Sequence, residues 1–289
     1  IGSNITARSY PLTLLCLHRL ARVQTTSLAA PVTTGMSQID YYIAGTLTAP
    51  ANAEVQYREK LVTVEGSGLC FRPLPEAPAT IFPDRSSWGA TADTIVFISG
   101  SNFRKINPEV RETWAKILAA VPNSILVLYP FGPNWGRHPQ LEMPFFRQMH
   151  EVLGRHGVNP QRLGLIKTLP SPADIRQCLT QADIYLDSYP YSGAASILDP
   201  LRMNLPAVVM AGEELRHCQS AAILQELQLN ELVARSETEY IQLAVALAAN
   251  PQLRQEGRSI IAQRMQDNPG FLDSRTYVAN MGVLFRSLV

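Results

Sequence analysis

A regular alternation of apolar strands and amphipathic helices between residues 94 and 210 most limits how this chain can fold. Strands are predicted at 94–99, 124–129, 162–167, 183–187 and 207–210, with a helical pattern in each interval. Consecutive strands joined by helices pair in parallel through right-handed crossovers. The stretch therefore predicts an α/β domain in which a parallel sheet carries helices on both faces.

The flanking segments give the predicted domain limits. Residues 1–65 show an incomplete α/β pattern, which we interpret as the C-terminal remnant of a preceding domain. Residues 66–92 are rich in proline and show no sustained period, as is typical of a linker. The main domain is predicted over 93–270 and a C-terminal helix over 271–289. The predicted elements of the first segment are helices at 8–21 and 53–61 and strands at 23–28 and 40–45.

The composition excludes several partners. Twenty-five basic and 24 acidic side chains leave a net charge of +1, so no global field attracts nucleic acid or an anionic membrane. The apolar stretch at 11–23 is too short to span a bilayer and contains charged residues. Four widely spaced cysteines without a CxxC pair indicate a reducing compartment, and we predict a cytoplasmic location.

Missing motifs exclude some enzyme classes. No GxGxxG follows a strand, which disfavours a dinucleotide dehydrogenase, and no GxxxxGK[ST] is present, which disfavours a P-loop NTPase. The sequence contains no Asp-x-Asp pair that could hold a divalent ion beneath a diphosphate. We therefore predict no metal site and no cofactor.

One loop at the expected ligand edge of the sheet carries a lysine. Ligands of open parallel sheets bind outside the carboxyl ends of the strands. After the strand at 94–99, Lys105 stands just before Asn107, a suitable N-cap, and Pro108, a suitable first helical residue. Such a lysine can bind a diphosphate at a helix N-terminus. The alternative is a solvent-exposed loop lysine.

A second loop at this edge reads "YPYSGAASILDPLRM" (189–203). Its small residues either let a helix pack closely on the sheet or let backbone N–H groups approach a phosphate. Asp199, one turn later, either accepts hydrogen bonds from ribose hydroxyls or complements the helix dipole. Because both loops leave the same edge, a nucleotide site becomes the favoured interpretation. The small residues at the start of the predicted helix are Gly193, Ala194, Ala195 and Ser196.

Several separate blocks of the chain form a pattern: "HRLARVQ" with "PVTTG" and "IDYYI" (18–43), "QYREKLV" (56–62), "SNFRKINPEVRETWAKILAAVPNSILVL" (101–128), "ADIYLDSYPYSGAASILDPLRMNLPAVVMAG" (182–212), "LNELVARSETEYIQLAVALA" (229–248) and a final "FLDSRTYVANM". In order and spacing, these blocks resemble the glycosyltransferase family that contains O-linked N-acetylglucosamine transferase and SPINDLY. The resemblance implies a GT-B fold, with two Rossmann-like domains and a nucleotide-sugar between them.

The resemblance also implies a function and a set of site residues. The function is metal-independent, inverting transfer of a sugar from UDP to a polypeptide. By position, Asn102 and Lys105 would contact the diphosphate, Lys105 being the residue with a catalytic role. Gly193, Ala194, Ala195 and Ser196 would hold phosphate oxygens and Asp199 the ribose. Leu28 and Ala29 would lie near the donor sugar.

The chain departs from the family in three places. Ala194, Ala195 and Ser196 stand where the transferases usually carry a His-Thr-Thr or similar polar run, so up to two side chains that contact phosphate are missing, while the backbone donors are retained. Ile175 and Cys178 stand where some members place a His and an Arg near the uracil. Tetratricopeptide repeats and the proposed catalytic histidine would lie upstream of residue 1, so this fragment alone is expected to be inactive.

Two alternatives remain open at this point. One is a related protein N-glucosyltransferase or O-fucosyltransferase, because loops decide the choice of donor. The other is a catalytically inactive module that binds a nucleotide or a partner, which the pair Ala194 and Ala195 favours.

Overall fold

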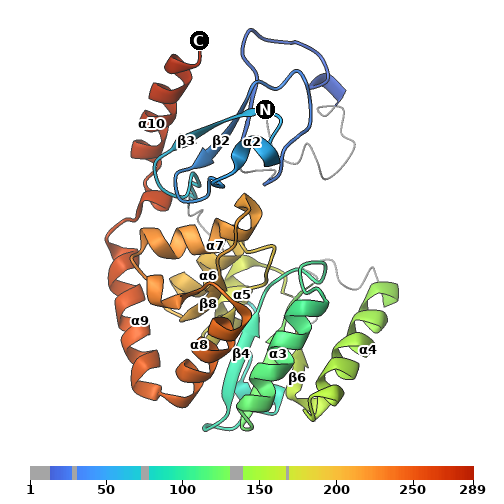
Figure 1. Cartoon of the computed structure of the whole chain (residues 1–289). Helices are drawn as coiled ribbons and strands as arrows, with labels where there is room; N and C mark the ends of the chain where they lie inside the picture. Colours follow the sequence, from blue (N-terminus) through green and yellow to red (C-terminus); the bar gives the residue numbers. More distant parts are fainter. Residues whose placement is uncertain (1–13, 28–30, 73–77, 131–138, 167–168) are drawn as a thin grey trace. The chain divides into compact units, whose positions relative to one another are not determined.

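The computed structural model describes residues 14–27, 31–72, 78–130, 139–166 and 169–289. The chain forms two compact units (Figure 1). Unit 1 contains Ile1–Pro73, Gly212–Gln228 and Asn268–Val289, and unit 2 contains Leu74–Ala211 and Leu229–Asp267. Each unit has its own parallel sheet in the described residues.

The sheet of unit 2 has the strand order β6-β5-β4-β7-β8-β9, and all neighbouring strands are parallel. The first strand of this sheet, β4, lies in its middle. The next two strands, β5 and β6, add outward on one side, and the chain then crosses to β7 on the other side of β4. This reversal between β4 and β7 is the topological switch point of doubly wound folds. The predicted parallel α/β sheet is confirmed. The strands are β4 (Ile95–Ser99), β5 (Ser124–Leu128), β6 (Leu163–Leu165), β7 (Ile184–Leu186), β8 (Ala207–Met210) and β9 (Val233–Ala234).

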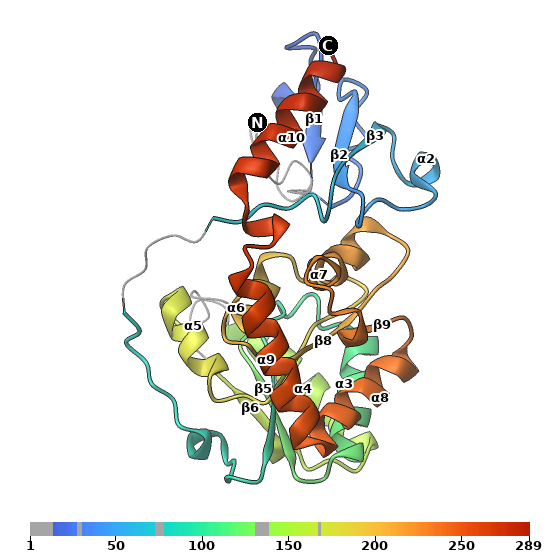
Figure 2. The same cartoon turned by 90° about the vertical axis from the view of Figure 1, so that its left-hand side faces the viewer.

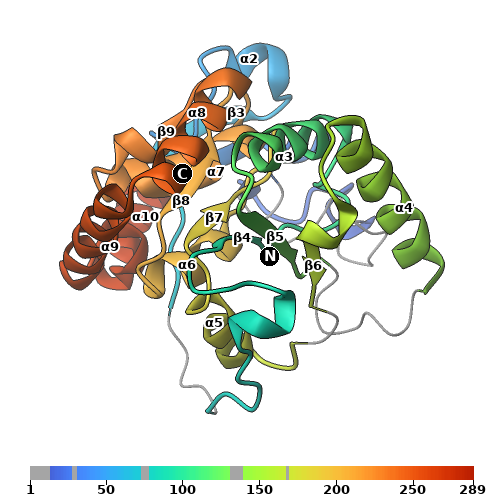
Figure 3. The ribbon, with the colours of Figure 1, turned by 90° about the horizontal axis from the view of Figure 1, so that it is seen from below.

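Helices cover both faces of this sheet (Figure 3). Helices α3 (Pro108–Ala120) and α4 (Pro139–Arg155) lie on one face, and α5 (Pro172–Leu179) and α6 (Leu198–Arg202) lie on the other. Asn107 starts α3 as predicted, because its side chain accepts a hydrogen bond from the Val110 N–H at 2.9 Å. The later helices of the unit are α8 (Glu237–Ala249) and α9 (Pro251–Gln266).

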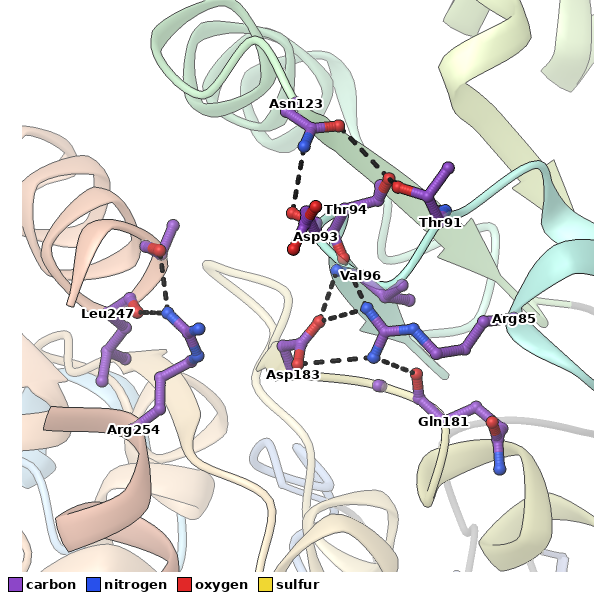
Figure 4. Close-up of polar contacts among 12 residues, drawn as sticks. Arg85, Thr91, Asp93, Thr94, Val96, Asn123, Gln181, Asp183, Leu247 and Arg254 are labelled. Carbon is purple, nitrogen blue, oxygen red and sulfur yellow. Dashed lines mark hydrogen bonds and ion pairs between the residues drawn. The ribbon is translucent and has the colours of Figure 1, made fainter. Parts of the chain in front are cut away.

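Arg85 closes the amino edge of the sheet (Figure 4). Its guanidinium pairs with Asp183 at 3.0 Å, just before β7, and donates to the carbonyls of Gln181 and Thr94. The Asp183 carboxylate also accepts from the Val96 N–H at 2.8 Å, so it joins β4 to β7. The segment that precedes β4 is thereby fixed to the edge opposite the expected ligand edge.

Asp174 in the first turn of α5 anchors the segment that leads into unit 2. It is fully buried and accepts from the N–H groups of Thr80 (2.6 Å) and Ile81 (2.8 Å) and from the Ser171 hydroxyl (2.6 Å). These hydrogen bonds lower the pKa of Asp174 to about 2. The carboxylate form is therefore the one that the folded chain stabilises.

We expect unit 2 to lose stability in acid because of Asp174. A carboxyl group whose folded pKa is depressed stabilises the fold above its unfolded pKa of about 3.9, and this contribution is lost as the pH falls toward 2. Thermal melts should show a falling melting temperature between pH 4 and pH 2. Asp174→Asn should melt lower at pH 7 and depend less on pH in this window. Equal pH dependence of the two proteins would contradict this role.

Unit 1 contains a three-stranded parallel sheet in its described residues, with order β1-β2-β3 and α10 (Ser274–Ser287) alongside (Figure 2). The predicted helix at 53–61 is partly wrong. Only α2 (Ala53–Gln56) is helical, and the β-branched run that follows pairs with the neighbouring strand. Residues 8–13 of the predicted helix at 8–21 lie outside the described residues, 14–15 are helical, and 16–17 form a turn. The strands are β1 (Thr25–Ser27), β2 (Tyr41–Gly45) and β3 (Lys60–Val64).

Glu226 at the end of α7 (Leu215–Glu226) joins the three parts of unit 1. Its carboxylate accepts from the Ser67 N–H at 2.5 Å and from the Phe271 N–H at 3.0 Å. The unit boundaries consequently differ from the sequence-based limits: 212–228 belongs to unit 1, and the described part of the linker after residue 77 packs in unit 2. Within the part of the chain that the structure describes, no helix is long and apolar enough to cross a membrane.

Candidate functional site

The candidate site lies where β4 and β7 end at the carboxyl edge of the unit 2 sheet. The two strands are adjacent and parallel, with Phe97 opposite Ile184. Gly100 follows β4 directly, and a side chain here would meet the ring of Tyr129 at 2.3 Å. The Gly100 N–H donates to the Tyr185 hydroxyl at 3.3 Å, which holds the start of the loop against β7. The loops at 100–106 and 187–194 thus leave the switch point together.

Lys105 joins these two loops. Its Nζ donates to the Ser192 carbonyl at 2.9 Å and lies 4.1 Å from the centre of the Tyr191 ring. The structure therefore brings Lys105 and the small-residue turn together, as expected from the sequence. An ammonium group has three N–H donors, and among the described residues only Ser192 accepts one of them.

Burial and one carboxylate act in opposite directions on Lys105. The partial burial of the side chain lowers its pKa, and the charge of Asp187 raises it. Asp187 comes directly after β7 and is 1% exposed. Its two carboxylate oxygens lie 2.9 and 3.3 Å from the Gly193 nitrogen, which donates to them. The Gly193 N–H consequently points to Asp187 in this structure.

The helix predicted to begin at the small residues after Gly193 begins later, at Leu198. Residues Ala195–Ile197 form a 3-10 turn, and α6 follows with only five residues, Leu198–Arg202. Ala194 stands at the N-cap position and has no side-chain acceptor for it. Ala195 and Ser196 open the turn, so their N–H groups have no acceptor inside it. Ala195 is exposed, and Ser196 is partly exposed.

Asp199 is ion-paired. Arg176 of α5 donates from Nη1 to Asp199 Oδ1 at 3.0 Å, and both side chains are mostly buried. A ribose would therefore meet a carboxylate that a guanidinium already orients. Sequence reasoning missed Arg176, because no local pattern shows that α5 and α6 lie side by side.

Asn102 and Cys178 do not share in the side-chain contact of Lys105 with Ser192, although the Asn102 carbonyl accepts from the Lys105 N–H at 2.7 Å. Asn102 is exposed, and among the described residues its side chain accepts only from the Arg104 N–H, at 3.1 Å. Cys178 is 1% exposed, and burial raises the pKa of its thiol to about 12, so it is a neutral core residue. Leu28 and Ala29 lie outside the described residues. No group of three metal-ligating side chains occurs among the residues that the structure describes.

A pocket of about 490 Å³ lies at the opposite, amino edge of the sheet, beside Arg85 and Arg254 (Figure 4). Arg85 is held by Asp183, and Arg254 donates to the carbonyls of Leu247 and Ala248 at the end of α8. These arginines cap carbonyls and an acid of the fold itself. The two arginines beside this pocket therefore have a structural role, and the carboxyl edge of the sheet remains the candidate site.

The family model for glycosyl transferase family 41 matches residues 75–281. The chain belongs to glycosyl transferase family 41. A relative from Oryza sativa subsp. japonica, "Probable UDP-N-acetylglucosamine--peptide N-acetylglucosaminyltransferase SPINDLY", is 34% identical over 96% of this chain and 28% of its own length. The protein of the same description from Petunia hybrida is 33% identical over 93% of this chain and 28% of its own length.

Solved structures agree with membership of family 41. An O-GlcNAc transferase mutant from Thermobaculum terrenum superposes with a TM-score of 0.79, is 27% identical, and covers 93% of this chain and 48% of its own. The glycosyltransferase WaaG has a TM-score of 0.55 at 13% identity, covering 88% of this chain and 65% of its own, and supports the fold alone. The fold is of the GT-B type. The chain spans just over a quarter of the length of its curated family 41 relatives.

Proposed function

We propose that this chain is the donor-binding C-terminal part of a UDP-sugar-dependent protein glycosyltransferase. The enzyme would transfer the sugar to polypeptides with inversion of the anomeric configuration. Membership of family 41 supports the reaction class. The observation that carries the proposal is Lys105, a partly buried ammonium at the switch point with a single acceptor among the described residues. Two of its N–H donors have no acceptor in the part of the chain that the structure describes, so they can bind phosphate oxygens.

The chemistry at this edge follows from the departing UDP. Transfer leaves negative charge on the diphosphate, and fixed positive groups that meet this charge lower the barrier. Lys105 supplies a full charge, and the N–H groups that open the Ala195–Ile197 turn supply partial charges. Asn102, in the same loop as Lys105, would contact the diphosphate. Asp199, in the first turn of α6, would bind the ribose. We place the protein in the cytoplasm, because its four cysteines are free.

The inactive binding module remains a second candidate because of one observation. Ala194 and Ala195 offer no side-chain donor to a phosphate. Backbone donors are unaffected by that change, so UDP binding is expected under both proposals. Sugar transfer by a longer protein that contains this chain separates them: transfer from UDP-N-acetylglucosamine to a peptide supports the enzyme, and UDP binding without any transfer supports the module.

We expect UDP and UDP-N-acetylglucosamine to bind this chain without a divalent ion, because Lys105 would supply the positive charge beneath the diphosphate. Calorimetry of UDP binding in EDTA should give the same affinity as in magnesium. Binding that is lost in EDTA and restored by magnesium would contradict metal independence. Failure of both ligands to bind in either buffer would reject the donor site itself.

A further inference from the structure

Asp187 is a buried acid whose backbone is held on both sides. Its N–H donates to the Val208 carbonyl of β8 at 3.0 Å, and its own carbonyl accepts from the Tyr240 hydroxyl of α8 at 2.7 Å. The side chain is 1% exposed. The backbone of Asp187 is therefore held in place at the carboxyl edge of the sheet, and its carboxylate lies next to the candidate donor site.

This carboxylate closes the loop that carries the contacts of Lys105. It accepts from the N–H of Gly193, six residues later, at 2.9 Å. Within the loop, the Ser188 hydroxyl donates to the Tyr191 carbonyl at 2.9 Å. Tyr191 and Ser192, the two residues that contact Lys105, thus lie inside a loop whose first residue, Asp187, is hydrogen-bonded to its last residue, Gly193.

Burial lowers the pKa of Lys105, whereas the charge of Asp187 also acts on this residue and raises its pKa. A buried lysine without an acid nearby tends to lose its proton, and a buried acid without a cation is costly. The tyrosines packed around the site are Tyr129, Tyr185, Tyr189 and Tyr240, and burial raises the pKa of each, so they stay neutral. The other nearby acid, Asp199, is paired with Arg176. Asp187 is therefore the acid that acts on Lys105.

We propose that Asp187 is a positioning residue of the donor site: its carboxylate holds the Tyr189–Gly193 loop, which contacts Lys105, and its negative charge complements the Lys105 ammonium where a diphosphate binds. The proposal rests on the proposed function for the identity of the ligand. The contacts of Asp187 with Gly193 and its charge beside Lys105 do not depend on that ligand. Both parts can therefore be measured separately.

The first measurement needs no nucleotide. Lysine is rare in this chain (Lys60, Lys105, Lys116 and Lys167), so lysine labelled with ¹³C at Cε gives few NMR signals, and Lys105→Met identifies the one from Lys105. Asp187→Asn retains an oxygen acceptor for Gly193 and removes the charge. We expect the Lys105 signal to titrate at lower pH in Asp187→Asn than in wild type. An unchanged midpoint would overturn the proposal.

Asp183→Asn is the matched control. It makes the same chemical change at the other end of β7, where Asp183 pairs with Arg85. A general loosening of the fold would move the Lys105 midpoint in both variants, whereas the proposed role moves it only in Asp187→Asn. If Asp187→Asn fails to fold, the wild-type chain still decides: its Gly193 amide should exchange slowly with solvent, and rapid exchange would overturn the loop contact.

The second measurement uses UDP. Affinity measured by calorimetry from pH 6 to pH 10 should fall as Lys105 loses its proton, and the fall should begin at lower pH in Asp187→Asn. Identical profiles would contradict the role of Asp187 while leaving the donor site intact. No UDP binding by wild type, together with a lowered Lys105 midpoint in Asp187→Asn, would reject the proposed function and support the coupling of the two residues.

Discussion

Replacing Lys105 with methionine is expected to weaken UDP binding to this chain by roughly ten- to hundredfold. A charge-assisted hydrogen bond to a phosphate contributes about 1.5–3 kcal/mol, and methionine keeps most of the length of the side chain without its charge or donors. The structure supports the estimate because the ammonium lies 2.9 Å from the Ser192 carbonyl, and its other two N–H donors have no acceptor among the described residues. Isothermal titration calorimetry at pH 7 measures the change.

Lys116→Met provides the matched control for this experiment. Lys116 lies on α3, the helix that follows the Lys105 loop, and its Nζ pairs with Glu237 at 2.7 Å on the surface. The same loss of charge there should leave UDP affinity unchanged. Near-ultraviolet circular dichroism would show that both variants are folded. Equal UDP affinity of Lys105→Met and wild type would remove Lys105 from the donor site.

The sequence was sufficient to predict the parallel sheet of unit 2 and the start of α3. Continuous apolar strands and capping residues such as Asn107 act locally, and the structure has them where the pattern indicates. The two-residue strand β9 was not predicted, because so short a segment has no recognisable strand pattern. Its extended conformation depends on pairing with Val209 of β8. The assignment of 212–228 to unit 1 depends on Glu226, whose partners are distant in sequence.

The candidate site was predictable only in part, because some of its contacts join residues from different helices and loops. Lys105 and the small-residue turn follow strands that any doubly wound order brings to one edge, so their convergence could be expected. The ion pair of Arg176 with Asp199 and the contact of Asp187 with Gly193 depend on how helices and loops pack. A signal for Asp187 did exist: an acid at the end of an apolar strand is costly unless something binds it.

Replacing Trp114 with alanine is expected to lower the free energy of unfolding by about 3–5 kcal/mol, the range for removing a fully buried large aromatic side chain. Trp114 has no exposed surface and lies on α3, which packs against α8. Its indole N–H points to the Tyr240 hydroxyl at 3.5 Å, and that hydroxyl donates to the Asp187 carbonyl at 2.7 Å. The cavity would therefore open directly behind the residue that positions the candidate donor loop.

Trp114→Phe separates the two contributions of this side chain. Phenylalanine fills most of the space but donates no hydrogen bond, and Tyr240 keeps its stronger bond to Asp187. Its loss of stability should therefore be clearly smaller than that of Trp114→Ala, since the 3.5 Å contact is long for a hydrogen bond. Urea unfolding followed by circular dichroism gives both values. Equal losses for the two variants would show that the N–H contact matters more than the cavity, whereas a loss below about 1 kcal/mol for Trp114→Ala would contradict the packing of α3 against α8 described here.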